Sequence, residues 1–144
     1  MEHYQRTAHT RFDIKFHFVW ITKYRKPLLR GEVGLRVRQI IRDVCAELEV
    51  EIIKGHISHD HVHLFVSSPP HVSPSKLMQR VKGKASRKLM QEFSHIRKQC
   101  WGRHVWARGF FVVSSGTITD EMIKEYIESQ DSIKPDKDFR VEGE

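Results

Sequence analysis

Two histidines separated by one residue offer the clearest chemistry in the sequence. His61 and His63 flank Val62, so on an extended strand both imidazoles point to one face of a sheet while Val62 points to the other. Two neutral imidazoles side by side make a good pair of metal ligands. The alternative is that they are hydrogen-bonded polar residues on a half-buried strand. Four histidines within eight residues, from His56 to His63, favour the metal site but do not decide the matter alone.

A tyrosine and a glutamine near the C-terminus could complete such a site. Tyr126 and Gln130 are four residues apart, which places them close together on one face of an expected helix. A tyrosine hydroxyl beside a metal-binding histidine pair suggests phosphoryl transfer, in which Tyr126 attacks a phosphodiester and a divalent cation polarises its non-bridging oxygens. The cation would be held by His61, His63 and the amide oxygen of Gln130. The sequence shows no general base, and the simpler alternative is that Tyr126 extends an apolar stripe through Met122.

The charge of the chain favours a polyanionic partner. Lysine and arginine number 25 against 18 acidic residues, a formal net charge of +7. Residues 73–108 contain ten basic residues and one acidic residue, whereas residues 119–144 contain nine acidic and four basic residues. This asymmetry predicts a nucleic-acid-binding face, with a merely solvated basic surface as the alternative. The candidate contacts are Arg11, Lys23, Arg25, Lys76, Arg80, Lys84, Arg87 and Lys88.

Alternating hydrophobic residues predict the strands that carry the histidines. In the first strand Phe16, Phe18 and Trp20 share one face. A turn-like stretch, residues 58–60, separates two extended segments, so these form a hairpin whose returning strand begins at His61. The expected strands are residues 12–21, 50–57, 61–67 and 109–115.

Helical spacing of apolar residues predicts three helices. They cover residues 31–49, a long segment that starts at Ser73 and Pro74, and a final segment from about residue 117 that carries Tyr126. Ser73 is a suitable cap and Pro74 suits the first helical position. Residues 96–106 are expected to be irregular, with Trp101 and Trp106 available for packing, the commoner role of tryptophan, or for stacking on bases.

The order strand, helix, strand, strand, helix, strand predicts an α+β fold of the ferredoxin-like split βαβ type. Its antiparallel sheet has helices on one face, its third strand lies centrally beside the first, and an added C-terminal helix carries the tyrosine nucleophile. Such a fold hosts many functions and establishes none of them.

Length and composition predict a single domain over residues 1–144, with a flexible N-terminus at 1–10 and a charged, mobile tail at 131–144. Cys45 lies on the apolar side of a predicted helix and Cys100 is the other cysteine, so no disulfide framework is indicated. No segment approaches the roughly 20 apolar residues of a membrane span, and no signal peptide is evident. The sequence therefore predicts a cytoplasmic protein without membrane contact.

The motifs resemble a known family. His61-Val62-His63, preceded by Asp60, resembles the His-hydrophobic-His motif of HUH nucleases. The segment from Tyr126 to Gln130 is similar to the nucleophile helix of the single-tyrosine transposases (TnpA type) of the bacterial 200/605 insertion-sequence superfamily. Further similar segments are residues 9–25, 82–84 and 106–110. The resemblance spans about residues 10–130.

This resemblance implies an activity and a set of roles. Such transposases cut and rejoin single-stranded DNA at hairpin-marked element ends, link a tyrosine to a 5′-phosphate and act as homodimers with composite sites. By resemblance, Tyr126 is the nucleophile and His61, His63 and Gln130 hold the metal ion. The ion is Mg²⁺ or Mn²⁺; because imidazole suits ions softer than Mg²⁺, Mn²⁺ is expected to serve better in vitro.

Three alternatives stand beside this interpretation. The chain could be a non-catalytic ferredoxin-like nucleic-acid-binding module whose exposed sheet aromatics stack bases, which leaves the Tyr126 and Gln130 pairing unexplained. It could be a zinc hydrolase, although Asp60, the nearest carboxylate, would point away from its histidine neighbours on a strand. It could also be a related HUH enzyme that acts on repeated chromosomal palindromes, with the same chemistry on another substrate. The zinc ligands would be His56, His59, His61 and His63.

Overall fold

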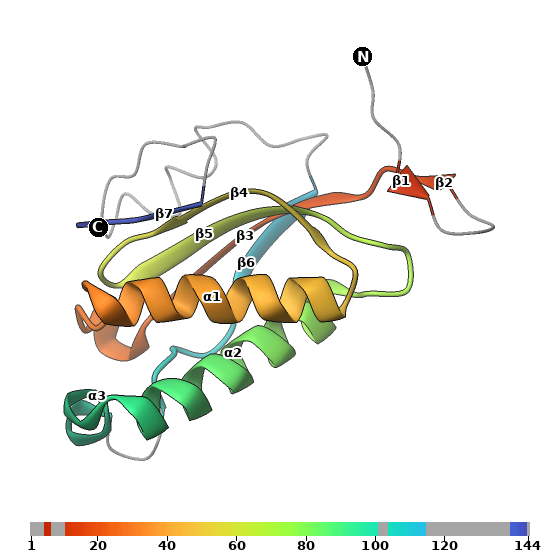
Figure 1. The fold of residues 1–144 in the computed structure, drawn as a ribbon. Coiled ribbons are helices and arrows are strands. Elements are labelled where there is room, and N and C mark those ends of the chain that lie inside the picture. Colours follow the sequence, from red (N-terminus) through yellow and green to blue (C-terminus); the bar gives the residue numbers. More distant parts are fainter. Residues whose placement is uncertain (1–4, 7–10, 101–103, 115–138, 144) are drawn as a thin grey trace.

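The fold is a five-stranded sheet whose long helices lie on one side (Figure 1). The computed structural model describes residues 5–6, 11–100, 104–114 and 139–143. In chain order the elements are β1 (Gln5–Arg6), β2 (Arg11–Phe12), β3 (Lys15–Ile21), the 3-10 helix η1 (Lys23–Arg25), α1 (Glu32–Glu47), β4 (Glu51–Ile57), β5 (His61–Ser67), α2 (Pro74–Glu92), α3 (Ser94–Gln99), β6 (Phe111–Ser114) and β7 (Phe139–Val141). Among the helices in these ranges, none combines the length and the apolar character needed to cross a membrane.

The strand order confirms the predicted topology. The sheet runs β6-β3-β5-β4-β7, so β5, the third long strand, lies centrally beside β3. Pairing is antiparallel from β6 to β4, and β7 is parallel to β4. The strands β6, β3, β5 and β4 follow one another in the order of the split βαβ arrangement. The predicted α+β ferredoxin-like sheet with helices on one face is therefore present.

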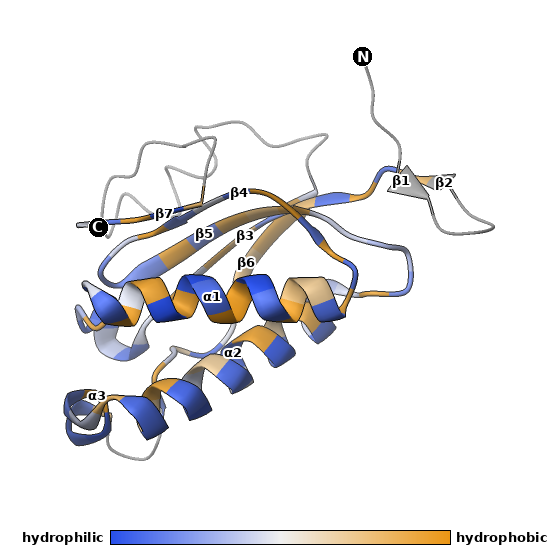
Figure 2. Ribbon diagram, in the orientation of Figure 1, coloured by the Kyte–Doolittle hydropathy of each residue, from blue (hydrophilic) through white to orange (hydrophobic). Residues whose placement is uncertain are grey.

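The hydrophobic core lies between this sheet and the two long helices. Apolar positions recur along one stripe of α1 and of α2, with hydrophilic positions on the remaining surface (Figure 2). These stripes meet Phe18 and Trp20 of β3 and Leu64 of β5, all fully buried. The buried residues of the two stripes include Val37, Ile40, Ile41 and Val44 from α1, and Leu77, Val81, Ala85 and Leu89 from α2.

The start of α2 and the role of Trp106 agree with the sequence predictions. The Ser73 hydroxyl accepts a hydrogen bond from the Lys76 amide at 3.1 Å, and Pro74 is the first helical residue. Trp106 is 7% exposed and packs edge-on against Trp20, with ring centroids 6.1 Å apart. Trp106 is therefore a packing residue.

Three segments differ from the sequence predictions. Helix α3 occupies part of the stretch expected to be irregular, and it is anchored by the buried Ile96. In the N-terminal segment expected to be flexible, β1 pairs with β2. Strand β7 lies in the expected mobile tail, where Phe139 and Val141 are buried against the sheet and α1. The predicted C-terminal helix falls outside the described residues.

Candidate active site

The two central histidines lie on the sheet face opposite the helices. In β5, Val62 and Leu64 face the helical core. Because alternate residues of a strand point to opposite faces, His61 and His63 face away from the helices. His61 is 0% exposed and His63 is 5% exposed. The predicted pairing of the two imidazoles on one face is therefore present.

Neighbouring strands add two further histidines to this face. His63 pairs with His56 of β4 across the hairpin, and His17 of β3 extends its Nδ1 to within 3.2 Å of His63 Nε2. The His17 ring also stacks on Phe65, with centroids 3.9 Å apart. His17 holds the His63 ring from the β3 side, while Phe65 fixes the plane of His17.

Burial keeps His63 neutral. Desolvation lowers its pKa to about 3, and the nearby His17, His56, His61 and Lys54 add repulsion against a further positive charge. A neutral imidazole keeps a lone pair, which ligation of a metal ion requires.

Asp60 determines which nitrogen of His61 is available. Its Oδ1 lies 2.8 Å from His61 Nδ1, and its Oδ2 lies 3.1 Å from Nη2 of Arg25. A carboxylate beside the Arg25 guanidinium acts only as an acceptor, so His61 Nδ1 carries the hydrogen and Nε2 carries the lone pair. Within the described part of the chain, that buried Nε2 has no hydrogen-bond partner. This is the arrangement of a metal-ligating histidine whose second nitrogen is held by a carboxylate, so the residues fit a divalent ion.

The position of Asp60 corrects one sequence expectation. On a strand its side chain would point away from His61, but Asp60 lies in the bend before β5, where the carboxylate can turn back to its neighbour. The bend is fixed to the segment after β3, because the Thr22 amide donates to Asp60 O at 2.9 Å and the Leu29 amide donates to His59 O at 2.9 Å. The loop that carries Arg25 thus holds Asp60 in place.

The four-histidine zinc site receives no support. Nδ1 of His59 lies 3.2 Å from Oε1 of Glu142, near β7. Across the described ranges, no group of three or more histidine, cysteine, aspartate or glutamate side chains converges in a way that could hold a metal ion. Two histidines with a ligand of another type remain compatible with these residues. Tyr126 and Gln130, the other predicted site residues, lie outside the described part of the chain.

The three aromatic residues of β3 considered for the base-stacking module do not form its platform. Phe18 and Trp20 are fully buried beneath the helices, and Phe16 packs against the same core. They are core residues and offer no stacking platform on the open face of the sheet.

The predicted DNA-binding residues fall into different environments. Arg25 is paired with Asp60, while Arg80 and Lys84 of α2 contact Glu47 of α1 at 3.0 and 3.4 Å. Among the described residues no ion pair is found for the exposed Lys76 and Arg87, nor for Lys23 and Lys88, which are partly buried. Arg11 lies in β2, but its side chain is not among those described. The basic residues of α2 therefore differ in whether an acidic residue already pairs with their charge.

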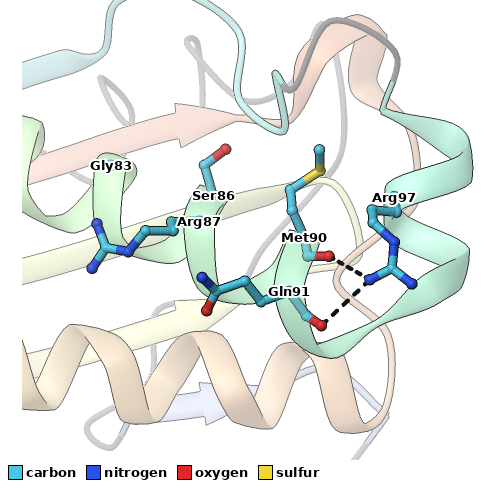
Figure 3. A pocket seen from close by; sticks show the side chains of 6 residues that line it. All are labelled: Gly83, Ser86, Arg87, Met90, Gln91 and Arg97. Carbon is cyan, nitrogen blue, oxygen red and sulfur yellow. Dashed lines mark hydrogen bonds between the residues drawn. The ribbon is translucent and has the colours of Figure 1, made fainter.

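A broad groove of about 750 Å³ runs beside α2 (Figure 3). Arg87 lines the groove and extends along α2 towards Gly83, whereas Arg97 of α3 turns back to donate to the carbonyls of Met90 and Gln91 at 2.8 and 3.3 Å. Arg97 thus completes the C-terminal end of α2. Lys82 likewise serves the fold, because its amine donates to the carbonyls of Ala107 and Gly109 at 2.9 Å each.

Sequence reasoning missed His17 as a neighbour of the histidine pair, named His56 only as a ligand of the alternative zinc site, and expected the Asp60 side chain to point away from the pair. A signal existed for His56: a turn over residues 58–60 places it opposite His63 in an antiparallel hairpin. His17 needed the register between β3 and β5, which the sequence does not specify locally.

Comparison with known proteins gives one consistent class. Residues 10–130 match the model of the family described as "Transposase IS200 like". The transposase for insertion sequence element IS200 of Salmonella typhimurium is 35% identical over 123 residues, which are 85% of this chain and 80% of that protein. The ISDra2 transposase TnpA of Deinococcus radiodurans is 29% identical over 119 residues, 83% of this chain and 85% of that protein.

Solved structures agree. A crystal structure of a transposase from Deinococcus radiodurans R1 has a TM-score of 0.75 at 25% identity and covers 90% of this chain and 99% of that one. A REP-associated tyrosine transposase, solved bound to a REP hairpin, has a TM-score of 0.57 at 14% identity and covers 89% of this chain and 69% of that one. At that identity, the second likeness supports the fold alone.

Proposed function

The chain belongs to the IS200-like transposase family, and on that premise we propose that it cuts and rejoins single-stranded DNA through a covalent phosphotyrosine on Tyr126. Transposases of this family are enzymes that cleave and transfer DNA. The observation that carries the proposal is His61: Asp60 directs its buried Nε2 lone pair onto the same face that holds the neutral His63. A phosphodiester bound there would meet both imidazoles.

In the proposed reaction the Tyr126 hydroxyl attacks the phosphorus of a phosphodiester. The new bond joins the phenolic oxygen to the 5′-phosphate, the bond to the 3′-oxygen breaks, and that oxygen leaves as a 3′-hydroxyl after taking up a proton. The phenol gives up its own proton during the attack. A 3′-hydroxyl then attacks the phosphotyrosine and releases Tyr126, so rejoining needs no nucleotide cofactor.

Members of this family generally need a divalent metal ion. We assign His61, His63 and Gln130 as the residues that would hold it, with Asp60 orienting His61 and His17 supporting His63. When bound, a divalent ion supplies charge stabilisation at the non-bridging phosphate oxygens. Mg²⁺ and Mn²⁺ are the candidates, and the nitrogen ligands favour Mn²⁺ in vitro.

The proposed partners are single-stranded DNA with subterminal hairpins and a second copy of the chain. The basic surface around α2 supplies the electrostatic attraction for DNA. A related role on chromosomal palindromes is the second candidate, because a REP-associated tyrosine transposase shares this fold. The two roles differ in DNA sequence and share their chemistry.

Covalent capture tests the proposal. The protein and its Tyr126→Phe variant are incubated with single-stranded hairpin DNA from the flanks of its own gene, or with chromosomal palindromes, labelled at the 5′ or 3′ end. Each reaction contains Mg²⁺, Mn²⁺ or EDTA and is resolved on denaturing gels. We expect a metal-dependent adduct on the 5′-phosphate side that is absent for Tyr126→Phe. DNA binding without any adduct would instead support the non-catalytic module.

The environments of the basic residues give a salt-dependence prediction. Each phosphate contact that is lost should reduce the slope of log K against log salt by about 1. We expect Arg87→Ala to show such a reduction, because Arg87 is exposed and lines the groove. Arg80→Ala should reduce it less, since Arg80 already pairs with Glu47 at 3.0 Å. Fluorescence anisotropy between about 50 and 200 mM salt measures both slopes; equal reductions would contradict the assignment.

A further inference from the structure

A tyrosine is presented to solvent on the turn that follows β3. Tyr24 is 80% exposed, and the large hydrophobic residues exposed in the described part of the chain are Tyr24 and Leu35, the latter at 38%. An aromatic ring this open to water contributes little to the core. Its position calls for another explanation.

The backbone of this turn is held in an unfavourable conformation. Tyr24 has φ 57° and ψ 20°, and Arg25 has φ 52°, both in the left-handed region that bulky residues rarely adopt. Hydrogen bonds on both sides fix the turn: the Lys23 amide donates to Val105 O at 2.8 Å, and the Thr22 hydroxyl donates to Lys26 O at 2.7 Å. Such enforced strain is typical of ligand-binding positions. In this turn the hydrogen-bonded backbone holds the Tyr24 ring towards solvent.

A small cavity of about 150 Å³ opens beside the ring. Leu28 and Cys100, both largely buried, give it an apolar side. The Lys23 amine lies 5.5 Å from the Tyr24 ring centroid. None of the lining residues that the structure describes is a carboxylate, and the cavity volume is below the roughly 300 to 1,000 Å³ of typical small-molecule sites. The lining residues are Lys23, Tyr24, Lys26, Leu28, Gln99, Cys100 and His104.

We propose that this turn is a binding site for one unpaired base of single-stranded DNA, stacked on the Tyr24 ring at the mouth of the cavity. A planar aromatic surface beside cationic side chains is the arrangement that holds an unpaired base and its phosphates. The cavity is large enough for one planar group and too small for a whole nucleotide. The inference rests on the proposed function, because it supplies a contact to the same DNA.

The same turn is connected to the proposed metal ligands. Arg25, next to Tyr24, pairs with Asp60 at 3.1 Å, and Asp60 contacts His61 at 2.8 Å. Strand β3 reaches this turn directly after Ile21, which is paired with His61. A base held on Tyr24 would therefore lie at the end of the sheet where β5 begins with His61, on the side that carries α3. The site would help to select where the single strand enters.

Fluorescent base substitution tests this site. Single 2-aminopurine residues are placed at successive positions of the single-stranded flank of a hairpin oligonucleotide, and the protein is added without metal. Stacking on Tyr24 should quench the fluorescence at one position. Tyr24→Phe should retain the quenching, whereas Tyr24→Asn should lose it, since asparagine tolerates the left-handed conformation but offers no ring. Leu35→Ala, which removes the other large hydrophobic side chain exposed in the described ranges, is the matched control.

Affinity gives the second measurement. Stacking of one base predicts that Tyr24→Asn weakens binding to the single-stranded flank roughly 5- to 150-fold, with no such change for Leu35→Ala. An abasic nucleotide at the quenched position should weaken binding to the wild type, and it should have no further effect on Tyr24→Asn. Wild-type affinity and quenching in Tyr24→Asn would overturn the inference while covalent capture stands. A wild type that binds no single-stranded DNA would remove the proposed function and this site together.

Discussion

The chemistry of the candidate site depends on the tautomer of a single histidine. His61 can present Nε2 because Asp60 occupies Nδ1, and Asp60 stays in place because Arg25 and the Thr22 amide hold it. A neighbouring histidine without this support could rotate or donate from the wrong nitrogen. Asp60, Arg25 and Thr22 are thus as relevant to metal binding as the motif itself.

Asp60→Asn tests that dependence. The substitution keeps the size of the side chain but removes the charge that pairs with Arg25 and allows the amide to present its NH₂ to His61. We expect Mn²⁺ affinity to fall about 10- to 100-fold, measured by electron paramagnetic resonance titration of free Mn²⁺. Glu142→Gln is the control, because Glu142 contacts His59 outside the pair. Equal Mn²⁺ affinity in Asp60→Asn and wild type would show that Asp60 does not orient the ligand.

Cys45 provides a pH-dependent prediction in the core. Burial raises the pKa of its thiol to about 12, so the folded protein holds this proton more tightly than the unfolded chain does. Its stabilising contribution is complete below the unfolded pKa and is lost as the pH rises towards 12, at up to about 1.4 kcal/mol per pH unit. Both proteins carry Cys100→Ala, and urea unfolding is measured at pH 8, 9.5 and 11. The free energy of unfolding of the protein that keeps Cys45 should exceed that of Cys45→Ala by less as the pH rises. If the free energies of unfolding of the two proteins changed in parallel with pH, the result would argue against a buried, neutral thiol.

At the level of elements, the sheet is extended by a strand that comes from far along the chain. Phe139 of β7 lies over Gly55 of β4, and a Cβ atom at Gly55 would collide with its ring. Val141 similarly lies over Gly34 of α1. The two glycines are thus explained by close approach of β7, and not by turn geometry.

A double-mutant cycle tests this contact. Phe139→Ala removes a buried ring and should reduce the free energy of unfolding by about 3 kcal/mol. Gly55→Ala should be destabilising alone but much better tolerated in the Phe139→Ala background, because the collision is then gone. Urea unfolding gives all four values, and Arg140→Ala, which alters the exposed residue between the two buried ones, is the control. Additive effects of Phe139→Ala and Gly55→Ala would contradict the packing of β7 on Gly55.

Strand β7 also shows where prediction from the sequence ends. Strand β5 and the start of α2 followed from local signals, namely alternation around the histidines and the Ser73-Pro74 pair. Strand β7 has three residues, and its stability comes from β4, whose sequence is more than 80 residues away. The contacts of Asp60 with Arg25 and of His63 with His17 are likewise long-range, so residue types suggested the histidine pair but not its supports.

At the level of the whole molecule, the remaining question is how Tyr126 reaches the histidine pair. If two copies exchange their final helices, each active site takes its histidines from one copy and its tyrosine from the other. His61→Ala and Tyr126→Phe each abolish cleavage in this scheme. A mixture of the two would nevertheless contain one site with intact histidines and an intact tyrosine.

Mixing the two inactive variants therefore distinguishes the assemblies. We expect partial recovery of covalent adduct formation, up to about a quarter of the wild-type level, because random exchange makes half of the dimers mixed and each has one complete site of two. The labelled adduct should form only on the chain that carries His61→Ala, which retains Tyr126, and mass spectrometry of tagged subunits identifies that chain. Recovery in the mixture requires exchange, so subunit exchange is first demonstrated by co-purification of differently tagged copies. No recovery despite exchange would mean that each site is built within one chain.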